Sequence, residues 1–356
     1  MSGAPRLSLI VPVYNGAGVL ARCLDSLARS SFRDYECLVV DDATTDASRE
    51  VAARDRVSVI ALEQRGGPAR ARNRGAERAR GELLVFLDAD VCVHADTLGE
   101  IDAHLRSHPR TAAVIGSYDD RPADPGFVSQ FKNLFHHYVH HTSRRDAWTF
   151  WAGCGAIRRA VFEQTHGFDE SYTRPCVEDI ELGFRLRTAG QRIDLNPAIQ
   201  VTHLKRWTLR GWLRTDLLDR GVPWLLLILR DRTMPADLNV SRAHRLSVAL
   251  VFMMVLLSAG IGVQLVMPWT THLPQFLWSR LAPLLLLVCA LLLIVLNYDL
   301  YRFFARQRGI WFAARAVPLH WLYYGNCGLA VGLGVIAYLW GKLPPRRQIP
   351  SPQPSP

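Results

Sequence analysis

Two aspartates one residue apart follow a strongly apolar run in the N-terminal half of the chain. Asp88 and Asp90 come directly after LLVFL, a composition typical of a strand that is buried on both faces. Ligands of an open α/β sheet bind beyond the carboxyl ends of its strands, and hard cations prefer carboxylate oxygens. The pair therefore predicts a site for Mg²⁺ or Mn²⁺. The alternative is a solvated turn, which is what most isolated Asp-x-Asp pairs are.

A second acidic pair closes another apolar run. Asp41 and Asp42 follow ECLVV, and an acid at the end of a second parallel strand can accept hydrogen bonds from a ribose or a base. Capping of the next helix by Thr44, Thr45 or Asp46 explains part of the same segment, and both interpretations can hold for different residues.

Two further candidates lie in the second half of the polar region. Glu178 and Asp179 begin a predicted helix, where the helix dipole favours acids, so a functional and a structural origin are equally supported. His203 ends the run IQVTH, and a neutral imidazole there could bind a metal, although a lone histidine is more often structural.

Arginines are concentrated around the segment that follows Gly66. A guanidinium matches the oxygens of a diphosphate, but so many on one helix cannot all reach one ligand, and most must be solvated. The arginines concerned are Arg65, Arg70, Arg72, Arg74, Arg78 and Arg80.

Short apolar runs alternate with stretches of helical composition through the first 120 residues or so. Strand, helix and strand in repetition predict an α/β domain with a mostly parallel, Rossmann-like sheet. The expected strands are Leu7–Tyr14, Glu36–Asp42, Val57–Leu62, Glu82–Asp90 and Thr111–Ser117.

Other possible metal ligands have unfavourable spacing. Four histidines, at 136, 137, 140 and 141, form two i, i+4 pairs on a predicted helix, but no third ligand is near, so a surface or interface helix is expected. The seven cysteines include no CxxC pair, which favours free thiols in a reducing compartment over a zinc site or a disulfide framework.

The C-terminal part of the chain becomes apolar. Leu246–Met267 and Leu281–Leu296 are candidate membrane spans, and Val317–Trp340 is a weaker third, because a span needs roughly 20 apolar residues. The chain has 42 basic and 32 acidic residues, a formal charge of +10. Much of the excess flanks the apolar segments, so we expect a membrane partner and no nucleic-acid partner.

The distribution of arginine predicts orientation. Arg302–Arg315 carries four arginines and Pro268–Arg280 carries one, so the positive-inside rule places the first segment in the cytoplasm, on the side of the polar domain. The N-terminal apolar run is too short for a signal peptide. We therefore expect a multi-pass protein of the cytoplasmic (inner) membrane whose polar domain faces the cytoplasm.

Four regions follow from these patterns. They are an α/β domain over 1–207, an amphipathic interfacial linker over 208–245, two or three transmembrane helices over 246–343, and a disordered tail over 344–356. Within the linker, Val222–Leu229 is apolar but too short to span a bilayer, so a helix lying at the membrane surface is expected.

Taken together, the motifs of the first 207 residues resemble those of family 2 glycosyltransferases, which have the GT-A nucleotide-sugar-binding fold. Each motif is weak alone, but they occur in the order typical of the family. The matching pieces are VPVYN (11–15), VDDATTD (40–46), GGPARARNRG (66–75), FLDADV (86–91), WAGCGAIRR (151–159), GFDE (167–170) and VEDIELGFRLRTAG (177–190).

The resemblance implies a metal-dependent transferase with a nucleotide-sugar donor. Pro12, Tyr14, Asn15 and Asp42 would border the base and ribose, and Arg72 would face the nucleotide. Asp88 would approach the ribose and the metal.

The remaining implied roles concern the reaction itself. Asp90 would bind the Mn²⁺ or Mg²⁺ that bridges the diphosphate, with His203 completing the metal site. Asp179, with Glu178 beside it, would be the general base for the acceptor hydroxyl, and a single displacement would invert the anomeric configuration.

The chain departs from the processive synthases of this family, because KRW at 205–207 only faintly matches their QxxRW motif. Transfer of one sugar to a lipid, lipid-linked or glycan acceptor in cell-envelope synthesis is therefore expected, with a polyprenyl-phosphate sugar synthase as the alternative. A sugar nucleotidyltransferase would have a glycine-rich, arginine-containing loop where VPVYNGAG stands. A non-catalytic membrane protein with a degenerate domain would not need intact Asp88, Asp90 and Asp179.

Overall fold

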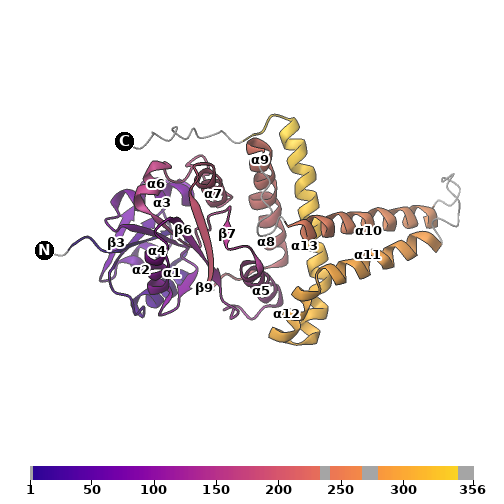
Figure 1. Cartoon of the computed structure of the whole chain (residues 1–356), viewed down its shortest axis with the longest axis horizontal. Helices are drawn as coiled ribbons and strands as arrows, with labels where there is room; N and C mark the ends of the chain where they lie inside the picture. The colour runs from indigo at the N-terminus through magenta and orange to yellow at the C-terminus, as the bar shows by residue number, and fades with distance from the viewer. Residues whose placement is uncertain (1–2, 233–240, 267–279, 344–356) are drawn as a thin grey trace. The chain divides into compact units, whose positions relative to one another are not determined.

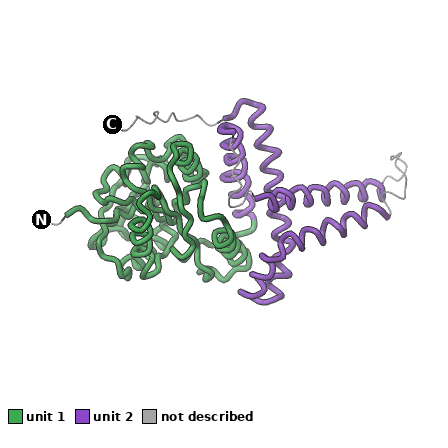
Figure 2. The backbone as a smooth tube through the Cα atoms, viewed as in Figure 1, with its two compact units in different colours: residues 1–209, 344–356 green, residues 210–343 purple. Residues whose placement is uncertain are grey.

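The computed structural model describes residues 3–232, 241–266 and 280–343. The chain divides into two compact units, one made of residues 1–209 with 344–356 and the other of residues 210–343 (Figure 2). The expected loop over 268–279 and the expected tail after Pro344 lie outside the described residues, as do Met267 and positions 233–240 of the expected linker.

The first unit is built on a nine-stranded mixed sheet with the order β3-β2-β1-β4-β8-β6-β9-β5, and β7 pairs with β9. Pairing is parallel among β3, β2, β1 and β4 and between β6 and β9, and antiparallel elsewhere. The strands are β1 (Leu7–Val13), β2 (Tyr35–Asp41), β3 (Val57–Ala61), β4 (Leu83–Leu87), β5 (Val91–Val93), β6 (Thr111–Tyr118), β7 (Asp146–Ala147), β8 (Cys154–Arg158) and β9 (Arg192–His203).

Helices cover both faces of this sheet, so the expected α/β architecture is confirmed (Figure 1). Alternate residues of the central strands, such as Leu9, Val39 and Val85, share one fully buried cluster with the inner faces of α1 and α4. The helices of this unit are α1 (Ala17–Ala28), α2 (Ser48–Ala52), α3 (Gly67–Arg78), α4 (Thr97–Ser107), α5 (Phe127–Thr142), α6 (Arg159–Gln164) and α7 (Glu178–Thr188).

The helix with four histidines is more buried than the expected surface helix would be. One face of α5 packs on β6, where the buried rings of His137 and His140 bond through Nδ1 to the carbonyl oxygens of Tyr118 and Gly116, at 2.8 and 3.0 Å. Burial lowers the pKa of His140 to about 4, so this ring is neutral. These imidazoles therefore serve the core by satisfying strand carbonyls.

The second unit is helical. Its elements are α8 (Leu209–Arg214), a π-helical segment η1 (Thr215–Gly221), α9 (Val222–Asp231), α10 (Arg242–Val266), α11 (Ala282–Leu296), α12 (Tyr298–Arg308) and α13 (Ile310–Leu339). Among the described residues, α10 and α13 are long and apolar enough to cross a membrane, and α11 with α12, bent by 64°, would form a third such element.

The close approach of α3 to the sheet depends on Gly75. A Cβ there would lie 2.5 Å from Cγ2 of Ile10 and 3.1 Å from Cγ2 of Val40, whereas a Cβ at Gly18 in α1 would meet nothing within 4 Å. We predict that Gly75→Ala lowers the free energy of unfolding by about 1–3 kcal/mol through overpacking. Gly18→Ala should leave it unchanged or raise it by up to about 1 kcal/mol. Thermal unfolding of both purified variants checks this, and equal stabilities would contradict the described packing.

Candidate active site

A buried arginine connects two of the expected acidic motifs. Arg72 lies on α3 and is 4% exposed. Its Nη1 donates to Oε1 of Glu178 and its Nη2 to Oδ1 of Asp88, each at 2.8 Å. The carboxyl end of β4 and the first turn of α7 are thereby brought to one point, although 90 residues of sequence separate Asp88 from Glu178.

Asp179 lies next to this cluster and is held by the backbone. Its Oδ2 accepts a hydrogen bond from the N–H of Ala152 at 3.2 Å. Burial and the negative charge of Glu178 raise its pKa to about 7, although Arg72 acts in the opposite direction. The carboxyl group therefore binds a proton more readily than an ordinary aspartate does, which suits a group that accepts a proton during a reaction.

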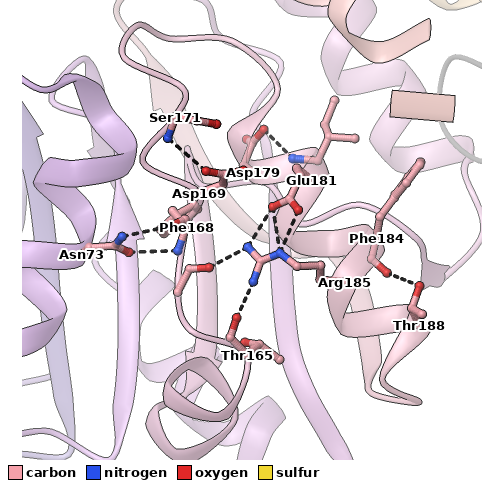
Figure 3. A network of polar contacts seen from close by, with 12 residues as sticks. Asn73, Thr165, Phe168, Asp169, Ser171, Asp179, Glu181, Phe184, Arg185 and Thr188 are labelled. Atoms are coloured by element: carbon pink, nitrogen blue, oxygen red, sulfur yellow. Dashed lines mark hydrogen bonds and ion pairs between the residues drawn. The ribbon is translucent and has the colours of Figure 1, made fainter. Parts of the chain in front are cut away.

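The start of α7 is fixed by a network around the loop that precedes it (Figure 3). Asn73 pairs with the backbone of Phe168, donating to its oxygen and accepting from its N–H, each at 2.9 Å. From the other side, buried Arg185 pairs with Glu181 and donates to the oxygens of Thr165 and Gly167. Because α3 and α7 both hold this loop, Glu178 and Asp179 have little freedom to move away from Arg72.

Antiparallel pairing of β5 with β9 brings a second pair together. Val91 faces His203 in the register, and Asp90 precedes Val91, so Nε2 of His203 lies 3.5 Å from Oδ2 of Asp90. Nδ1 of His203 is 2.6 Å from Oδ1 of Asn133, which fixes the ring with Nε2 toward Asp90. Burial alone would raise the pKa of Asp90, but the hydrogen bond and charge of His203 hold it below its ordinary value.

These two side chains fit a divalent metal better than the expected set of three. Within the described ranges, no group of three or more His, Cys, Asp or Glu side chains is placed to hold a metal ion. Asp88 is instead bonded to Arg72, while Asp90 and His203 present an oxygen and an oriented nitrogen to the same point. Mg²⁺ and similar ions are commonly held by one or two protein ligands, with phosphate and water supplying the rest.

Four of the residues expected at the nucleotide, Pro12, Tyr14, Asn15 and Asp42, lie together at the ends of β1 and β2. The polar groups of Asn15 and Asp42 already hold turns. Both carboxylate oxygens of Asp42 accept backbone N–H bonds from Gly66 and Gly67, at 2.7 and 2.9 Å. Oδ1 of Asn15, a residue with φ of 49°, accepts bonds from Thr44 and Thr45. These contacts fix the shape of the edge.

The same edge presents an exposed aromatic ring. Tyr14 is 40% exposed and the guanidinium of Arg65 lies over its ring at 3.8 Å, while Pro12 is half-buried within β1. Sequence reasoning counted Arg65 among the arginines of this segment but did not single it out. The sequence alone does not reveal this cation–π contact, because Tyr14 and Arg65 lie on different loops that meet only in the fold.

Tyr118 at the end of β6 was also missed. Its ring stacks on that of His203, with centroids 4.2 Å apart and planes 6° apart, and meets Trp151 edge-on at 4.7 Å. Trp151 directly precedes Ala152, the residue that bonds Asp179. Tyr118 thus packs between the His203 side and the Asp179 side of the site, and no local sequence signal marks it.

Comparison with known proteins agrees with this geometry. Residues 8–165 match the model of the family described as glycosyl transferase family 2. Residues 8–165 are therefore similar to this family and are called the family 2 domain below. They extend from β1 to β8 and include the Asp88–Asp90 motif, and the chain continues beyond them through α7 and β9.

Curated relatives of the family 2 domain are sugar transferases by name. Validoxylamine A glucosyltransferase of Streptomyces hygroscopicus subsp. jinggangensis (strain 5008) is 32% identical over 223 residues, which cover 53% of each chain. The PGL/p-HBAD biosynthesis glycosyltransferase of Mycobacterium tuberculosis (strain ATCC 25177 / H37Ra) is 37% identical over 120 residues, 32% of this chain and 46% of that one. The chain thus spans about half the length of these relatives.

A solved structure supports the fold. The mannosyltransferase of Pyrobaculum calidifontis, determined in complex with GDP-Man and Mn²⁺, aligns with a TM-score of 0.51 and 20% identity, covering 96% of this chain and 89% of that one. The GT-A fold of the family 2 domain is confirmed by this likeness together with the family match.

The buried ion pair generates a stability prediction. Arg72→Met leaves Glu178 buried without its cation, so we predict a loss of about 3 kcal/mol, of which Glu178→Gln in the same chain recovers part. Asp88 contributes little to this loss because its side chain is 37% exposed and screened by water. Arg74→Met is the matched control, since Arg74 pairs with Glu77 on the surface of the same helix and should cost less than about 1 kcal/mol. Thermal unfolding of these three variants and of the unsubstituted chain measures this, and a similar loss for Arg72→Met and Arg74→Met would contradict it.

Proposed function

We propose that this chain is a glycosyltransferase that moves a single sugar from a nucleotide-sugar to an acceptor hydroxyl, with inversion at the anomeric carbon. The observation that carries the proposal is the bridge from Arg72 to Asp88 and Glu178, which brings the Asp88–Asp90 motif of a family 2 domain to the first turn of α7, where Asp179 lies. The names of the relatives support sugar transfer without specifying the sugar for this chain.

Asp179 is proposed as the general base. An acceptor hydroxyl is a weak nucleophile, so a carboxylate within hydrogen-bond reach assists by taking its proton as the oxygen attacks. The N–H of Ala152 orients one oxygen of Asp179, and the charges of Glu178 and Arg72 adjust its affinity for a proton in opposite directions. A single displacement with the base on the acceptor side inverts the configuration.

Asp90 and His203 are proposed as the protein ligands of Mn²⁺ or Mg²⁺, and Asp88 as a group near the ribose and metal. When bound, such an ion stabilises negative charge on the departing diphosphate. The support is the 3.5 Å separation of Asp90 and His203, together with the fixation of the imidazole by Asn133. The Pyrobaculum mannosyltransferase was solved with Mn²⁺, which is consistent with a divalent ion in this fold.

The donor is proposed to bind at the edge formed by the ends of β1 and β2. Tyr14, with Arg65 over its ring, offers a surface for a base, and Pro12 lines the same edge. Asn15 and Asp42 would keep the two turns in place, and their remaining acceptor capacity faces the nucleotide. Arg72 would attract the anionic donor, although its two bonds to acids limit how far it can move.

The second unit is proposed to anchor the enzyme in the cytoplasmic membrane, with the family 2 domain on the cytoplasmic side and a lipid or lipid-linked acceptor at the bilayer surface. The support is the length and composition of α10 and α13 and the arginines of Arg302–Arg315. Assays of the full chain with soluble and lipid-linked hydroxyl acceptors distinguish anchoring for localisation from a lipid acceptor.

The metal assignment predicts a specific binding defect. Asp90→Asn removes one of two protein ligands, so we expect the Mn²⁺-dependent rise in unfolding temperature caused by the correct nucleotide-sugar to be lost. Asp55→Asn, at an exposed aspartate of the same domain, is the control and should keep the full shift. A panel of nucleotide-sugars with and without Mn²⁺ supplies the measurement. An unchanged metal-dependent shift in Asp90→Asn would exclude Asp90 as a ligand.

The base assignment predicts the pH dependence of turnover. Because the pKa of Asp179 is raised to about 7 and only the ionised form accepts a proton, kcat/KM should rise as pH increases through about 7 and level off above it. Asp179→Asn should lower kcat at least about 100-fold while donor binding persists.

The same raised pKa provides the folding control. The pKa of Asp179 is higher in the fold than in the unfolded chain. The free energy of unfolding therefore falls as the pH rises from the unfolded-state pKa to the folded-state pKa, and changes little above that. Asp179→Asn should therefore be at least as stable as the unsubstituted chain at pH 8, with a smaller advantage at pH 5. An inactive variant that is also unfolded at pH 8 would leave the catalytic role unsupported and contradict the electrostatic assignment.

A further inference from the structure

The helical unit contains a sharp change of direction between an apolar and a basic helix. α11 and α12 meet at Asn297 with an angle of 64° between them. The bend is held by hydrogen bonds, since Asn297 donates through Nδ2 to Oγ of Ser247 at 3.2 Å and accepts at Oδ1 from the hydroxyl of Tyr324 at 2.7 Å. α12 is therefore fixed at an angle to α11 by contacts from α10 and α13.

The apolar helix has the surface expected of a membrane-facing element. α10 and α11 run side by side (Figure 1), and the outer face of α11 exposes Leu284, Leu287, Leu291 and Val295 by 55%, 56%, 52% and 69%. An exposed surface of this kind suits acyl chains. With α11 directed into a bilayer, the 64° bend turns α12 toward the plane of the membrane surface.

α12 has an apolar face that packs within the helical unit and a basic face that is exposed. On one face, Phe304 packs edge-on against Phe312 of α13 at 5.7 Å, and the hydroxyl of Tyr301 lies 3.1 Å from Nδ1 of His320. On another face, Arg302 and Arg306 are four residues apart and exposed. Arginines or lysines on the exposed polar face are characteristic of helices that lie at a membrane surface.

The turn into α13 continues the same surface. Arg308 and Arg315 are exposed there, and Ile310 and Trp311 are 69% and 81% exposed. Tryptophan is enriched at the level of the headgroups because its ring is partly apolar and partly polar. Residues 298–315 contain four arginines and one acidic residue, Asp299, so this surface is strongly basic.

We propose that α12 and the first two turns of α13 form a binding surface for anionic phospholipid headgroups, with Arg302 and Arg306 contacting phosphate and Trp311 at the boundary with the acyl chains. The inference rests on the membrane association proposed above and is independent of the transferase activity. The bend, the exposed leucines of α11 and the exposed tryptophan favour a membrane over a nucleic acid as the anionic partner.

Lipid retention by the full chain tests the proposal. The purified protein is reconstituted into vesicles of phosphatidylcholine and phosphatidylglycerol, extracted with a mild detergent, and its retained lipids are quantified by mass spectrometry. The unsubstituted chain should enrich phosphatidylglycerol over the bulk ratio, and the double variant Arg302→Gln/Arg306→Gln should lose at least about fivefold of that enrichment. The control Arg56→Gln/Arg110→Gln, at exposed positions of the first unit, should keep it.

A depth measurement supplies a second readout. Fluorescence quenching by lipids brominated near the headgroup or near the chain end is compared between the unsubstituted chain and Trp311→Phe. The difference in quenching between the two proteins reports on Trp311. This difference should be larger with the lipids brominated near the headgroup than with those brominated near the chain end. Quenching from the deep bromines or from neither, or equal lipid enrichment in all proteins, would overturn the proposal.

These experiments distinguish failure of the lipid-surface proposal from failure of the proposed reaction or of the proposed membrane association. Normal lipid enrichment in a chain without transferase activity contradicts the proposed reaction only. A chain that stays in solution without detergent and does not associate with vesicles contradicts both the membrane association and the lipid surface.

Discussion

Burial of one guanidinium between two acids is the interaction on which the site depends. A buried charge is tolerated only when it is paired and hydrogen-bonded, so Arg72 requires Glu178 and Asp88, and buried Glu178 requires Arg72. Electrostatics thus ties the carboxyl edge of the sheet to the start of α7 without a covalent link. The same cluster keeps three carboxylates close together, and burial, assisted by the negative charge of Glu178, raises the pKa of Asp179.

The fold supplies the second half of the site by strand pairing. β5 has only three residues, but its antiparallel register with β9 is enough to place Asp90 against His203. Asn133 and Tyr118 then hold the imidazole from its Nδ1 edge and from its face. Asp90 thus lies beside an oriented histidine and has a lowered pKa, whereas Asp179 has a raised pKa. Two aspartates of the same domain therefore have opposite electrostatic environments.

Local sequence patterns predicted the elements of the site but not its contacts. Asp88, Asp90, Glu178 and Asp179 were recognisable because each ends a strand or begins a helix, and the order of the motifs indicated the family. The bond from Arg72 to Glu178 joins residues 106 positions apart, and that from His203 to Asn133 joins residues 70 apart. Periodicity carries no information at such separations. The buried face of α5 was mispredicted for a related reason, because its histidines are polar in sequence but bond to strand carbonyls in the fold.

The weak hydropathy of the third apolar segment has a structural explanation. α9, α10 and α12 all pack on α13, and its glycines and polar residues are used in that packing. A Cβ at Gly328 would lie 2.0 Å from the ring of Phe252 on α10, and one at Gly334 would lie 2.6 Å from Leu225 on α9. Small residues permit such close approach between helices in a membrane. A helix that packs against several others needs fewer exposed leucines than a helix at the edge of the bundle, so its mean hydropathy is lower. α11, with its exposed leucines, has the high hydropathy of a peripheral helix.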